Sequence, residues 1–555
     1  MTEIKGDKRF NRTHRRRNGI YYTSSQNIGK LLIPLLENVT KENAARCTFF
    51  DPACGSGNFL VETKKYLEEK GIATEERQYA GIEIEPAAVE EAKRRLPGAR
   101  IVRGNALTMD WGDLVTPSKD LFIFGNPPFA GDYNKSKEQQ KELENVFAPY
   151  PAGKLDYCAA WYYKAAKFLN DSGGRFAFVS TNSITQGAQV RDLFKPIFDL
   201  GWKISFAWPS VLWDNDASVY VVIIGFTQKE GDTPRIFDLI EDEEFDWKNG
   251  IGFEAKEVEN ISPYNLEALP TVFINPKKPL SKLPEACFGS QHIDGNGLIL
   301  STPEEKAEAD KDPVAAKYVR KYMEADELIN NKPKWCLWLV DSTPEERRKS
   351  KFLKQRIESV RIFRSSSRRA STKNAASRAW EFASIHQPDC NYLAIPRHFS
   401  KNREYFTVGY ESPDVIASDA LFTVEDPDGF AFSVIESSMF MAWQGLAGGR
   451  IGEGYRFSNT LVWNTFPLPS LTEEQKDLII EGGRKVLEAR ADYPSSSLAD
   501  LYDPDNMPPD LKKAHEALDK AVDAIFSDKP LRSEEERQKA LLEAYEEMTG
   551  EKERE

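Results

Sequence analysis

The segment CTFFDPACGSGNFLVETKKYLEEKG, residues 47–71, decides the fold of this chain. Its apolar start reads as a short buried strand, and its second half has the spacing of an amphipathic helix. Between them, Gly55 and Gly57 allow a tight turn and a close approach of the backbone to a ligand. The order strand, glycine loop, helix is typical of nucleotide-binding folds.

Strands and helices alternate after this segment. QYAGIEIEPAAVEEAKRRL at 78–96 reads as a strand and a helix, and DLFIFGNPPF at 120–129 contains another strand. This alternation predicts an α/β fold with a mostly parallel, doubly wound sheet and ligands at its carboxyl edge. From about residue 230 the alternation fades. The predicted parts are a basic arm (1–20), an α/β domain (21–230), a mixed region (231–470) and a charged helical segment (471–555).

The composition limits the classes of protein to consider. The chain has 555 residues, and its charged fraction of 29% fits a soluble globular protein. We see no apolar run long enough to span a bilayer, and no signal peptide of the usual form. The six cysteines lack a CxxC pair, which predicts reduced thiols in the cytoplasm, without a disulfide framework or a metal site.

The charge is unevenly distributed. The net charge is −13, yet Lys and Arg gather in residues 5–17 and again in residues 346–373. Local basic stripes matter more for phosphate binding than the total charge does. A charged run is more often only a solvated face, so the stripes alone do not establish nucleic-acid binding.

Two acidic residues flank the glycine loop in the predicted sheet. Asp51 directly precedes the loop, and Glu83 ends the second strand. A pyrophosphate prefers bare backbone N–H groups, whereas a carboxylate suits a cation, such as the amino or sulfonium side of S-adenosylmethionine. Glu83 stands where an acidic residue holds ribose hydroxyls in doubly wound folds. The simpler roles, a helix cap for Asp51 and a surface carboxylate for Glu83, stay open.

The run DLFIF ends in Asn126, Pro127, Pro128 and Phe129. Two consecutive prolines make a stiff turn that is rich in acceptors, because proline has no N–H. The Asn126 amide oxygen and the Pro127 carbonyl can accept hydrogen bonds from a planar amino group, and Phe129 can stack on its ring. The alternative is a rigid loop with a polar cap.

These motifs together resemble the amino-DNA methyltransferases, which methylate adenine N6 in duplex DNA. YYTSS at 21–25 resembles the cofactor-flanking motif that precedes DPACGSG in this family, in the order of its γ arrangement. LDYCAAWYYKAAKFL at 155–169 and LYDPDNMPPDLKKAHEALDKAVD at 501–523 are similar to MmeI-like (type IIL) restriction–modification polypeptides. The resemblance covers about residues 18–530.

The resemblance implies a class I S-adenosylmethionine-dependent methyltransferase sheet, a target-recognition domain over 231–470 and a C-terminal helical segment. It implies a site-specific enzyme that transfers a methyl group from S-adenosylmethionine to a flipped adenine of double-stranded DNA. Only the arm of residues 1–20 precedes YYTSS, so we expect methylation without an intrinsic nuclease. We also expect a monomer, with a separate restriction endonuclease as a candidate partner.

Residue roles carry over from the family motifs. The expected catalytic residues are Asn126, Pro127, Pro128 and Phe129, with Phe129 and Trp213 stacking on the base and Trp208 as the second choice. The expected cofactor-binding residues are Tyr22, Thr23, Asp51, Ala53, Gly55, Gly57, Asn58, Phe59, Glu83, Ile84, Asn105, Ala106 and Asn126. The expected DNA-binding residues are Arg361, Arg364, Arg368, Arg369 and Arg450.

Several alternatives stay open. Asn105 stands where the family often has an acidic residue, although its amide could still bond the amino group of the cofactor adenine. Asp156 is interpreted as a helix cap, and Cys54 as a small turn residue, because no Pro-Cys follows for C5-cytosine chemistry. Methylation of RNA or of a protein glutamine amide, and a non-catalytic DNA-binding homologue, are the competing functions.

Overall fold

The computed structural model describes residues 24–131, 134–213, 219–240, 243–264, 267, 272–275, 279–400, 402–451 and 454–550. The chain divides into two compact units, the first ending at Ile274 and the second running from Asn275 to Glu551. Within the described ranges, every helix is too short or too polar to cross a membrane.

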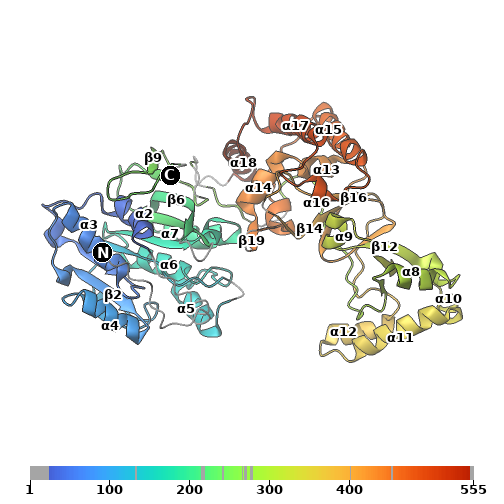
Figure 1. Ribbon diagram of the computed structural model, residues 1–555, viewed down its shortest axis with the longest axis horizontal. Helices are drawn as coiled ribbons and strands as arrows, with labels where there is room; N and C mark the ends of the chain where they lie inside the picture. The colour runs from blue at the N-terminus through green and yellow to red at the C-terminus, as the bar shows by residue number, and fades with distance from the viewer. Residues whose placement is uncertain are drawn as a thin grey trace. The chain divides into compact units, whose positions relative to one another are not determined.

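The first unit is built on one nine-stranded sheet in the order β3-β2-β1-β4-β5-β7-β6-β8-β9 (Figure 1). Strands β1 to β5 are parallel, and β7 runs antiparallel between β5 and β6. This sheet confirms the predicted doubly wound α/β class. The strands are β1 (Thr48–Asp51), β2 (Tyr79–Glu83), β3 (Arg100–Arg103), β4 (Leu121–Gly125), β5 (Arg175–Thr181), β6 (Lys203–Trp213), β7 (Val219–Thr227), β8 (Arg235–Leu239) and β9 (Phe253–Glu257).

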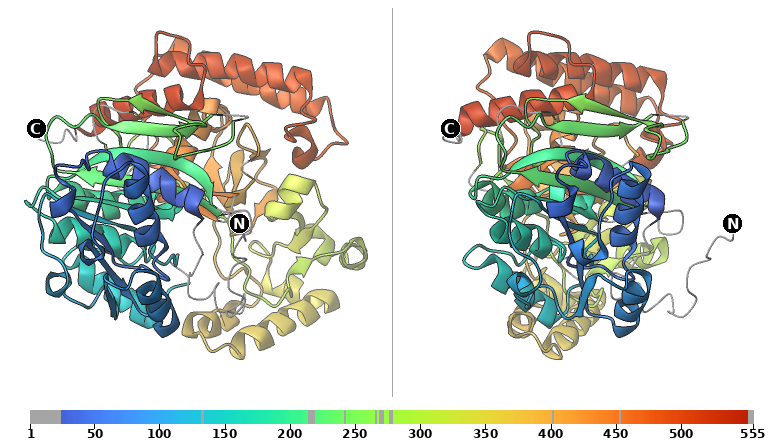
Figure 2. Two further views of the ribbon diagram at one scale, coloured as in Figure 1. Left: turned by 60° about the vertical axis from the view of Figure 1, so that its left-hand side comes forward. Right: turned by 90° about the vertical axis from the view of Figure 1, so that its left-hand side faces the viewer.

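Helices cover both faces of this sheet (Figure 2). Successive side chains of a strand point to opposite faces, so Phe49 packs in the core beneath α2 to α4, whereas Phe50 meets Trp111 on the other side at 5.2 Å between ring centroids. On that second face, Tyr162 of α6 lies 5.2 Å from Phe178. The helices are α2 (Ser25–Leu36), α3 (Asn58–Glu69), α4 (Pro86–Arg95), α5 (Lys137–Phe147), α6 (Ala159–Phe168) and α7 (Ala188–Phe198).

The sheet extends beyond the predicted boundary near residue 230, which is therefore wrong. β8 pairs in parallel with β6, and β9 pairs with β8. The loop between them returns to the start of the unit, where Trp247 lies 5.1 Å from Tyr66 and would be 2.2 Å from a Cβ added at Gly29. β9 is an edge strand whose side chains are nearly all exposed, so it lacks the apolar pattern by which a strand is recognised in sequence.

The second unit combines small sheets with helices. Its strand orders are β10-β18-β14-β16, β11-β13-β12-β17 and β15-β20-β19. The strands are β10 (Ala286–Phe288), β11 (Ile299–Leu300), β12 (Val319–Met323), β13 (Trp335–Leu337), β14 (Tyr392–Pro396), β15 (His398–Phe399), β16 (Gly409–Glu411), β17 (Val415–Ala417), β18 (Leu421–Glu425), β19 (Gly449–Ile451) and β20 (Gly454–Arg456). The helices are α8 (Pro303–Asp310), α9 (Ala325–Asn330), α10 (Pro344–Lys349), α11 (Lys351–Ser365), α12 (Ala370–Asn374), α13 (Phe430–Ile435), α14 (Ser438–Ala447), α15 (Glu473–Ala491), α16 (Leu498–Leu501), α17 (Pro509–Phe526) and α18 (Glu534–Thr549).

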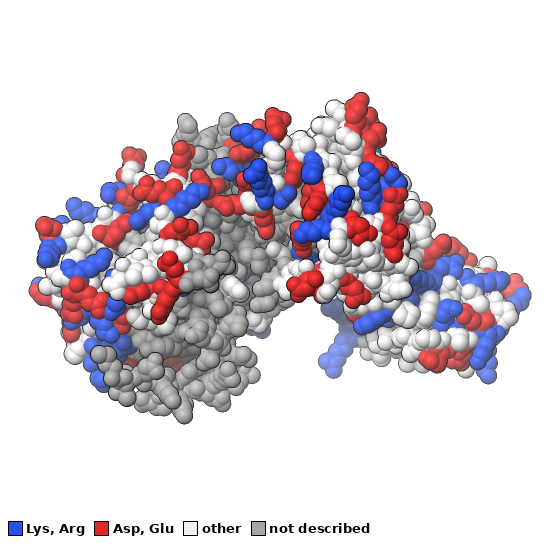
Figure 3. Space-filling model, turned by 45° about the horizontal axis from the view of Figure 1, so that its top comes forward, with Lys and Arg blue, Asp and Glu red and all other residues white. Residues whose placement is uncertain are grey.

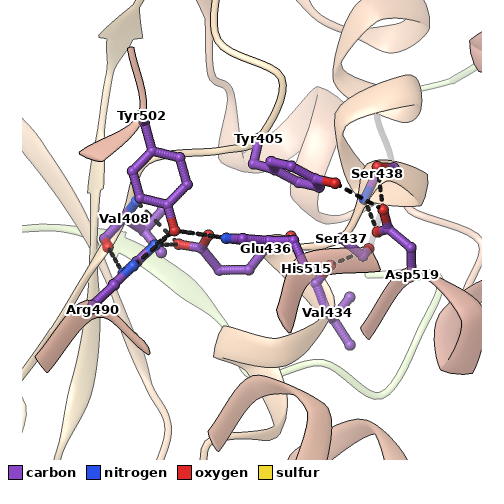
Figure 4. A network of polar contacts seen from close by, with 10 residues as sticks. All are labelled: Tyr405, Val408, Val434, Glu436, Ser437, Ser438, Arg490, Tyr502, His515 and Asp519. Atoms are coloured by element: carbon purple, nitrogen blue, oxygen red, sulfur yellow. Dashed lines mark hydrogen bonds and ion pairs between the residues drawn. The ribbon is translucent and has the colours of Figure 1, made fainter. Parts of the chain in front are cut away.

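A buried polar network joins the C-terminal helices to the rest of the second unit (Figure 4). Arg490 of α15 donates to the fully buried carboxylate of Glu436 at 2.5 Å. His515 of α17 stacks on Tyr405 with ring centroids 4.0 Å apart, and burial lowers its pKa to about 3, so it is neutral. Asp519 accepts from the backbone N and the hydroxyl of Ser438, both at 2.7 Å. The predicted helical segment is thus an integral layer of this unit.

Candidate functional site

The glycine loop, residues 52–57, turns from β1 into α3. Gly55 and Gly57 have φ values of +53° and +83°, which side-chain-bearing residues rarely adopt. A Cβ added at Gly55 would meet no atom within 4 Å, so the backbone there borders open space. Gly57 caps α3 and packs on α4, where an added Cβ would lie 3.3 Å from the Cβ of Ala92. The loop therefore has the shape to accept a ligand at Gly55.

Asp51 is a buried carboxylate with one oxygen left over. Its side chain is 1% exposed, and its Oδ1 accepts from the backbone N of Ala53 at 2.9 Å. Its Oδ2 is buried and has no hydrogen-bond partner among the described residues. Burial raises the pKa of Asp51 to about 8, and the nearby charge of Glu83 adds to this shift. Since α3 is capped by Gly57, Asp51 is no helix cap, and its spare oxygen suits a cationic group.

Glu83 ties the end of β2 to the glycine loop. Its Oε2 accepts from the backbone N of Gly55 at 2.9 Å, and its Oε1 from those of Ile84 and Glu85 at 2.8 Å. Burial raises its pKa. An ionised carboxylate offers about four acceptor positions, so Glu83 can still accept from a hydroxyl. The neighbouring Ile84 is 58% exposed, an apolar side chain left open beside this carboxylate.

Asn105 has a fixed amide orientation. Its Oδ1 accepts from the backbone N of Leu107 at 2.9 Å, and its Nδ2 donates to Glu142 at 2.7 Å. A flipped amide would place donor against donor and acceptor against acceptor, so the network selects this orientation. The expected bond from an adenine amino group must therefore share an oxygen that Leu107 already uses. Asn105 replaces the acidic residue that the family often has at this position. The nearest carboxylate in this network is that of Glu142, which accepts the hydrogen bond from Asn105 Nδ2.

The other residues expected at the cofactor have mixed surroundings. Asn58 accepts from Arg95, which also donates to the carbonyl of Ser56 at 2.9 Å and thereby braces the loop. Phe59 is only 4% exposed and its ring belongs to the core. Ala106 is buried, and its carbonyl accepts from Lys164 at 2.7 Å. Tyr22 and Thr23 lie outside the described residues.

The NPPF loop, residues 126–129, follows β4 at the same edge of the sheet. β4 is the parallel neighbour of β1, so the loop begins beside the end of β1. A Cβ added at Gly125 would lie 2.4 Å from the Oδ1 of Asp51, which shows how closely the two motifs approach. Pro127 is buried, whereas Phe129 is half-buried and packs against the core of the unit. The sheet thus brings together the glycine loop, Asp51 and the NPPF loop, as the motifs predict.

Asp156, just before α6, and Trp161, within it, contact these loops, which the sequence did not reveal. Asp156 accepts from the backbone N of Cys158 at 3.3 Å, as in an Asx turn, and from that of Ala130 at 2.9 Å. Trp161 donates to the carbonyl of Pro52 at 3.1 Å. The only signal in the sequence is an acidic residue just before a mostly apolar helix, which a capping role explains equally well.

Burial excludes Trp208 as a base-stacking residue and Cys54 as a nucleophile. Trp208 is fully buried and stacks on Phe237 at 5.1 Å, so the second choice for a base-stacking residue is wrong. Trp213 lies in β6, with its side chain outside the described part of the structure. Cys54 is buried and its pKa is raised well above the ordinary value by burial, so it has no nucleophilic character. Within the described residues, no group of three His, Cys, Asp or Glu side chains could hold a metal ion.

Arg364 is a structural residue, and its prediction as a DNA contact is wrong. It is 1% exposed, and its guanidinium donates to five backbone carbonyls, two of them on His292 and Ile293. Arg356 of the same stripe donates to the carbonyl of Ile299 at 2.7 Å. Five donors satisfied by carbonyls leave none for a phosphate or a base.

The other predicted arginines differ from Arg364. Arg361, Arg368 and Arg369 are exposed, and Arg361 pairs with Glu358 on the surface of α11. Arg450 lies in β19, with its side chain outside the described part. Figure 3 shows one face of the molecule, on which Lys and Arg are interspersed with Asp and Glu. Among the described residues visible on that face, Asp and Glu form no continuous acidic surface.

Comparisons with known proteins agree on one family. Residues 86–238 match the model described as "MmeI, DNA-methyltransferase domain", residues 268–470 "MmeI, target recognition domain" and residues 471–552 "MmeI, C-terminal domain". DNA methyltransferase A of Bacillus subtilis (strain 168) is 32% identical over 96% of this chain and 67% of its own length.

A solved structure of the type IIL restriction-modification enzyme MmeI, in complex with DNA, is similar over 98% of this chain and 80% of its own, with a TM-score of 0.80 and 35% identity. The methylase subunit of the type I restriction enzyme MjaIX of Methanocaldococcus jannaschii is 27% identical over 31% of this chain and 30% of its own length. The similarity to MmeI therefore includes both units of this chain.

Proposed function

Since this chain belongs to the MmeI family of DNA methyltransferases, we propose that it methylates the N6 amino group of adenine at one specific sequence in duplex DNA. The observation that carries this proposal is the contact of the two motifs. A Cβ added at Gly125 would lie 2.4 Å from Oδ1 of Asp51 and 3.4 Å from Oδ2, the oxygen that we assign to the cation, so this carboxylate lies beside the start of the NPPF loop. The modification activity of a restriction–modification or related defence system is the setting that we propose.

The residues at the end of β1 and β2 fit S-adenosylmethionine, which supplies an activated methyl group when it is bound. The free Oδ2 of Asp51 accepts from its amino group, and the open space at Gly55 admits the ligand to the backbone. Glu83 retains acceptor capacity for the ribose hydroxyls, and the exposed Ile84 provides an apolar surface for the adenine ring. Among the described residues, Oδ2 of Asp51 has no hydrogen-bond partner and Gly55 borders open space, so both are available to the ligand.

The NPPF loop supplies what an amino group needs to act as a nucleophile. The adenine N6 lone pair is delocalised into the ring, so the amine is weakly nucleophilic. Acceptors on Asn126 and Pro127 hold its hydrogens and stabilise positive charge as it develops in the transition state. Phe129 stacks on the base, which must leave the duplex at a cost of a few kcal/mol before it can reach the loop.

We propose that the second unit holds the duplex. It contains residues 275–470 of the segment that matches a target recognition domain, and Arg361, Arg368 and Arg369 are exposed on it. Exposed guanidinium groups can bind phosphates or read base edges in the major groove. The solved structure of MmeI, which is similar to this chain over both units, is a complex with DNA, and this supports the proposal.

The test is base-modification sequencing of plasmid DNA from a methylation-deficient bacterial host that expresses this chain, beside an Asn126→Ala control. We expect N6-methyladenine at one recurrent sequence and its loss in the control. If no modified adenine appears while the folded protein binds S-adenosylmethionine, the proposal is refuted. The substrate is then another planar amino group, on RNA or on a protein glutamine amide.

A further inference from the structure

We infer that Asp156 is a positioning residue for the NPPF loop. This inference rests on the proposed function, because it concerns how Asn126 and Pro127 are kept aimed at the amino group. Asp156 does not contact a reacting atom. It holds Ala130, the residue that directly follows the loop, and through it the end of the loop.

Ala130 is held by two hydrogen bonds to Asp156 and Tyr157, which lie just before α6. Its backbone N donates to Asp156 Oδ1 at 2.9 Å, and its carbonyl accepts from the backbone N of Tyr157 at 3.0 Å. Pro127 and Pro128 have no N–H with which to anchor the loop. The anchor at Ala130 therefore has a direct influence on where the two acceptors point.

Asp156 is itself held from several sides, which makes it a rigid support. Its side chain is 3% exposed, and its Oδ2 accepts from the hydroxyl of Thr181 at 3.3 Å, at the end of β5. Its backbone N donates to Gln189 of α7 at 2.8 Å. β5 is the sheet neighbour of β4, which carries the NPPF loop. Asp156 thus braces the loop against the sheet and α7.

The residues that follow Asp156 extend the support to the cofactor side. The Tyr157 hydroxyl donates to Glu142, which also accepts from Asn105. One turn later, Trp161 donates to Pro52 of the glycine loop at 3.1 Å. Residues 156–161, which lead into α6, therefore contact both loops and hold them in fixed relative positions, as the transfer of a group between them requires.

A simple turn-stabilising role for Asp156 makes a different prediction. That role needs only the bond from Cys158, which at 3.3 Å is longer than the bond from Ala130. The serine side chain is shorter than that of aspartate by one covalent bond. Its hydroxyl can still accept from the backbone N of Cys158, two residues further along the chain. Asp156→Ser therefore keeps the turn and loses the hold on Ala130, whereas Asp156→Asn keeps an oxygen for both.

The experiment uses the full chain and unmethylated plasmid DNA that contains the target sequence identified by base-modification sequencing. Single-turnover transfer from tritiated S-adenosylmethionine is measured with enzyme in excess, beside cofactor affinity and the unfolding midpoint. We expect Asp156→Ser to slow transfer by about 100-fold, the effect of a misplacement of roughly 1 Å, with unchanged cofactor affinity. Asp156→Asn is expected to restore most of the rate, and Asp113→Ser, at an exposed site of the same unit, to leave it unchanged.

Two results would overturn the inference alone. One is an Asp156→Ser protein that transfers methyl groups as fast as the wild type. The other is a loss of rate that is matched by a loss of cofactor binding and of folded protein, which indicates a structural role only. Failure of the proposed function is distinguishable, because the wild type itself then labels no adenine amino group, and the inference falls with it.

Discussion

Asp51→Asn is expected to weaken the binding of S-adenosylmethionine and to remove much of its pH dependence. The reason is the state of Asp51 in the free protein. Burial at 1% exposure raises its pKa to about 8, the charge of Glu83 adds to the shift, and the bond from Ala53 opposes it. A cationic group can use the Oδ2 atom only when Asp51 is ionised.

The magnitude follows from this pKa. With a pKa of about 8, about one Asp51 in ten is ionised at pH 7, and each pH unit below 8 costs about 1.4 kcal/mol of binding free energy. The dissociation constant should therefore fall by about tenfold from pH 6 to pH 7, and binding at pH 7 should release about 0.9 proton. Burial raises the pKa of Glu83 as well, which acts in the same direction.

Isothermal titration calorimetry between pH 6.0 and 7.5, in two buffers of different ionisation enthalpy, measures both quantities. The upper limit matters because an α-amino group titrates near pH 8 itself. Asp113→Asn, which removes an exposed carboxylate, is the matched control and should behave as the wild type. A wild-type affinity that does not change over this range, or an Asp51→Asn variant with the wild-type slope, would refute the assignment of Asp51 to the cation.

Three further outcomes are expected. Gly125→Ala should abolish most cofactor binding in equilibrium dialysis while the protein stays folded, because its Cβ would stand 2.4 Å from the Asp51 carboxylate; unchanged binding would contradict the close contact. Arg490→Met should lower the free energy of unfolding of the second unit by about 3–5 kcal/mol in urea titrations, since it leaves a buried carboxylate unpaired; a loss under 1 kcal/mol would contradict this. The double substitution Arg368→Ala and Arg369→Ala should weaken DNA binding. It should also reduce the slope of the logarithm of the DNA-binding constant against the logarithm of the salt concentration by about 2, and an unchanged slope would contradict the prediction.

The sequence predicted the part of the site that local patterns encode. Asp51, the glycines and the NPPF loop each follow a short apolar strand, and a doubly wound order places such strand ends at one edge. The structure shows β1 and β4 as parallel neighbours, which brings the two motifs together. The chemical roles of these residues stay predictions, because a fold determines where side chains lie and not what they bind.

The arginine stripe shows where a sequence signal was present but misread. Leu353, Ile357, Val360 and Arg364 are the buried residues of α11, and their spacing follows one helical face. Arg364 continues the apolar face, so its burial was readable from its register. The prediction of a DNA contact rested on the positive charge of Arg364 and ignored its position on the apolar face of α11. The carbonyls that satisfy it come from other segments, which no local pattern reveals.

The boundary near residue 230 failed for the opposite reason. Strands β1, β2, β4 and β5 are largely buried, but β8 has one buried residue and β9 has none. Its place in the sheet depends on backbone pairing with β8 and on the return of Trp247 to α2 and α3. Neither depends on a periodic pattern, so the loss of alternation was mistaken for the end of the domain.

The two ends of the NPPF loop are held by different parts of the site. At one end, Gly125 lies against Asp51, which we propose to bind the cofactor. At the other, Ala130 is bonded to Asp156, which is supported by β5 and α7. Only four residues separate Gly125 from Ala130, and two of them are prolines with fixed φ. A chain that is short and stiff cannot absorb a shift at one end, so the position of Asp51 and the aim of Asn126 are coupled through the loop. Loading of the cofactor and alignment of the acceptors are therefore expected to be parts of one structural event.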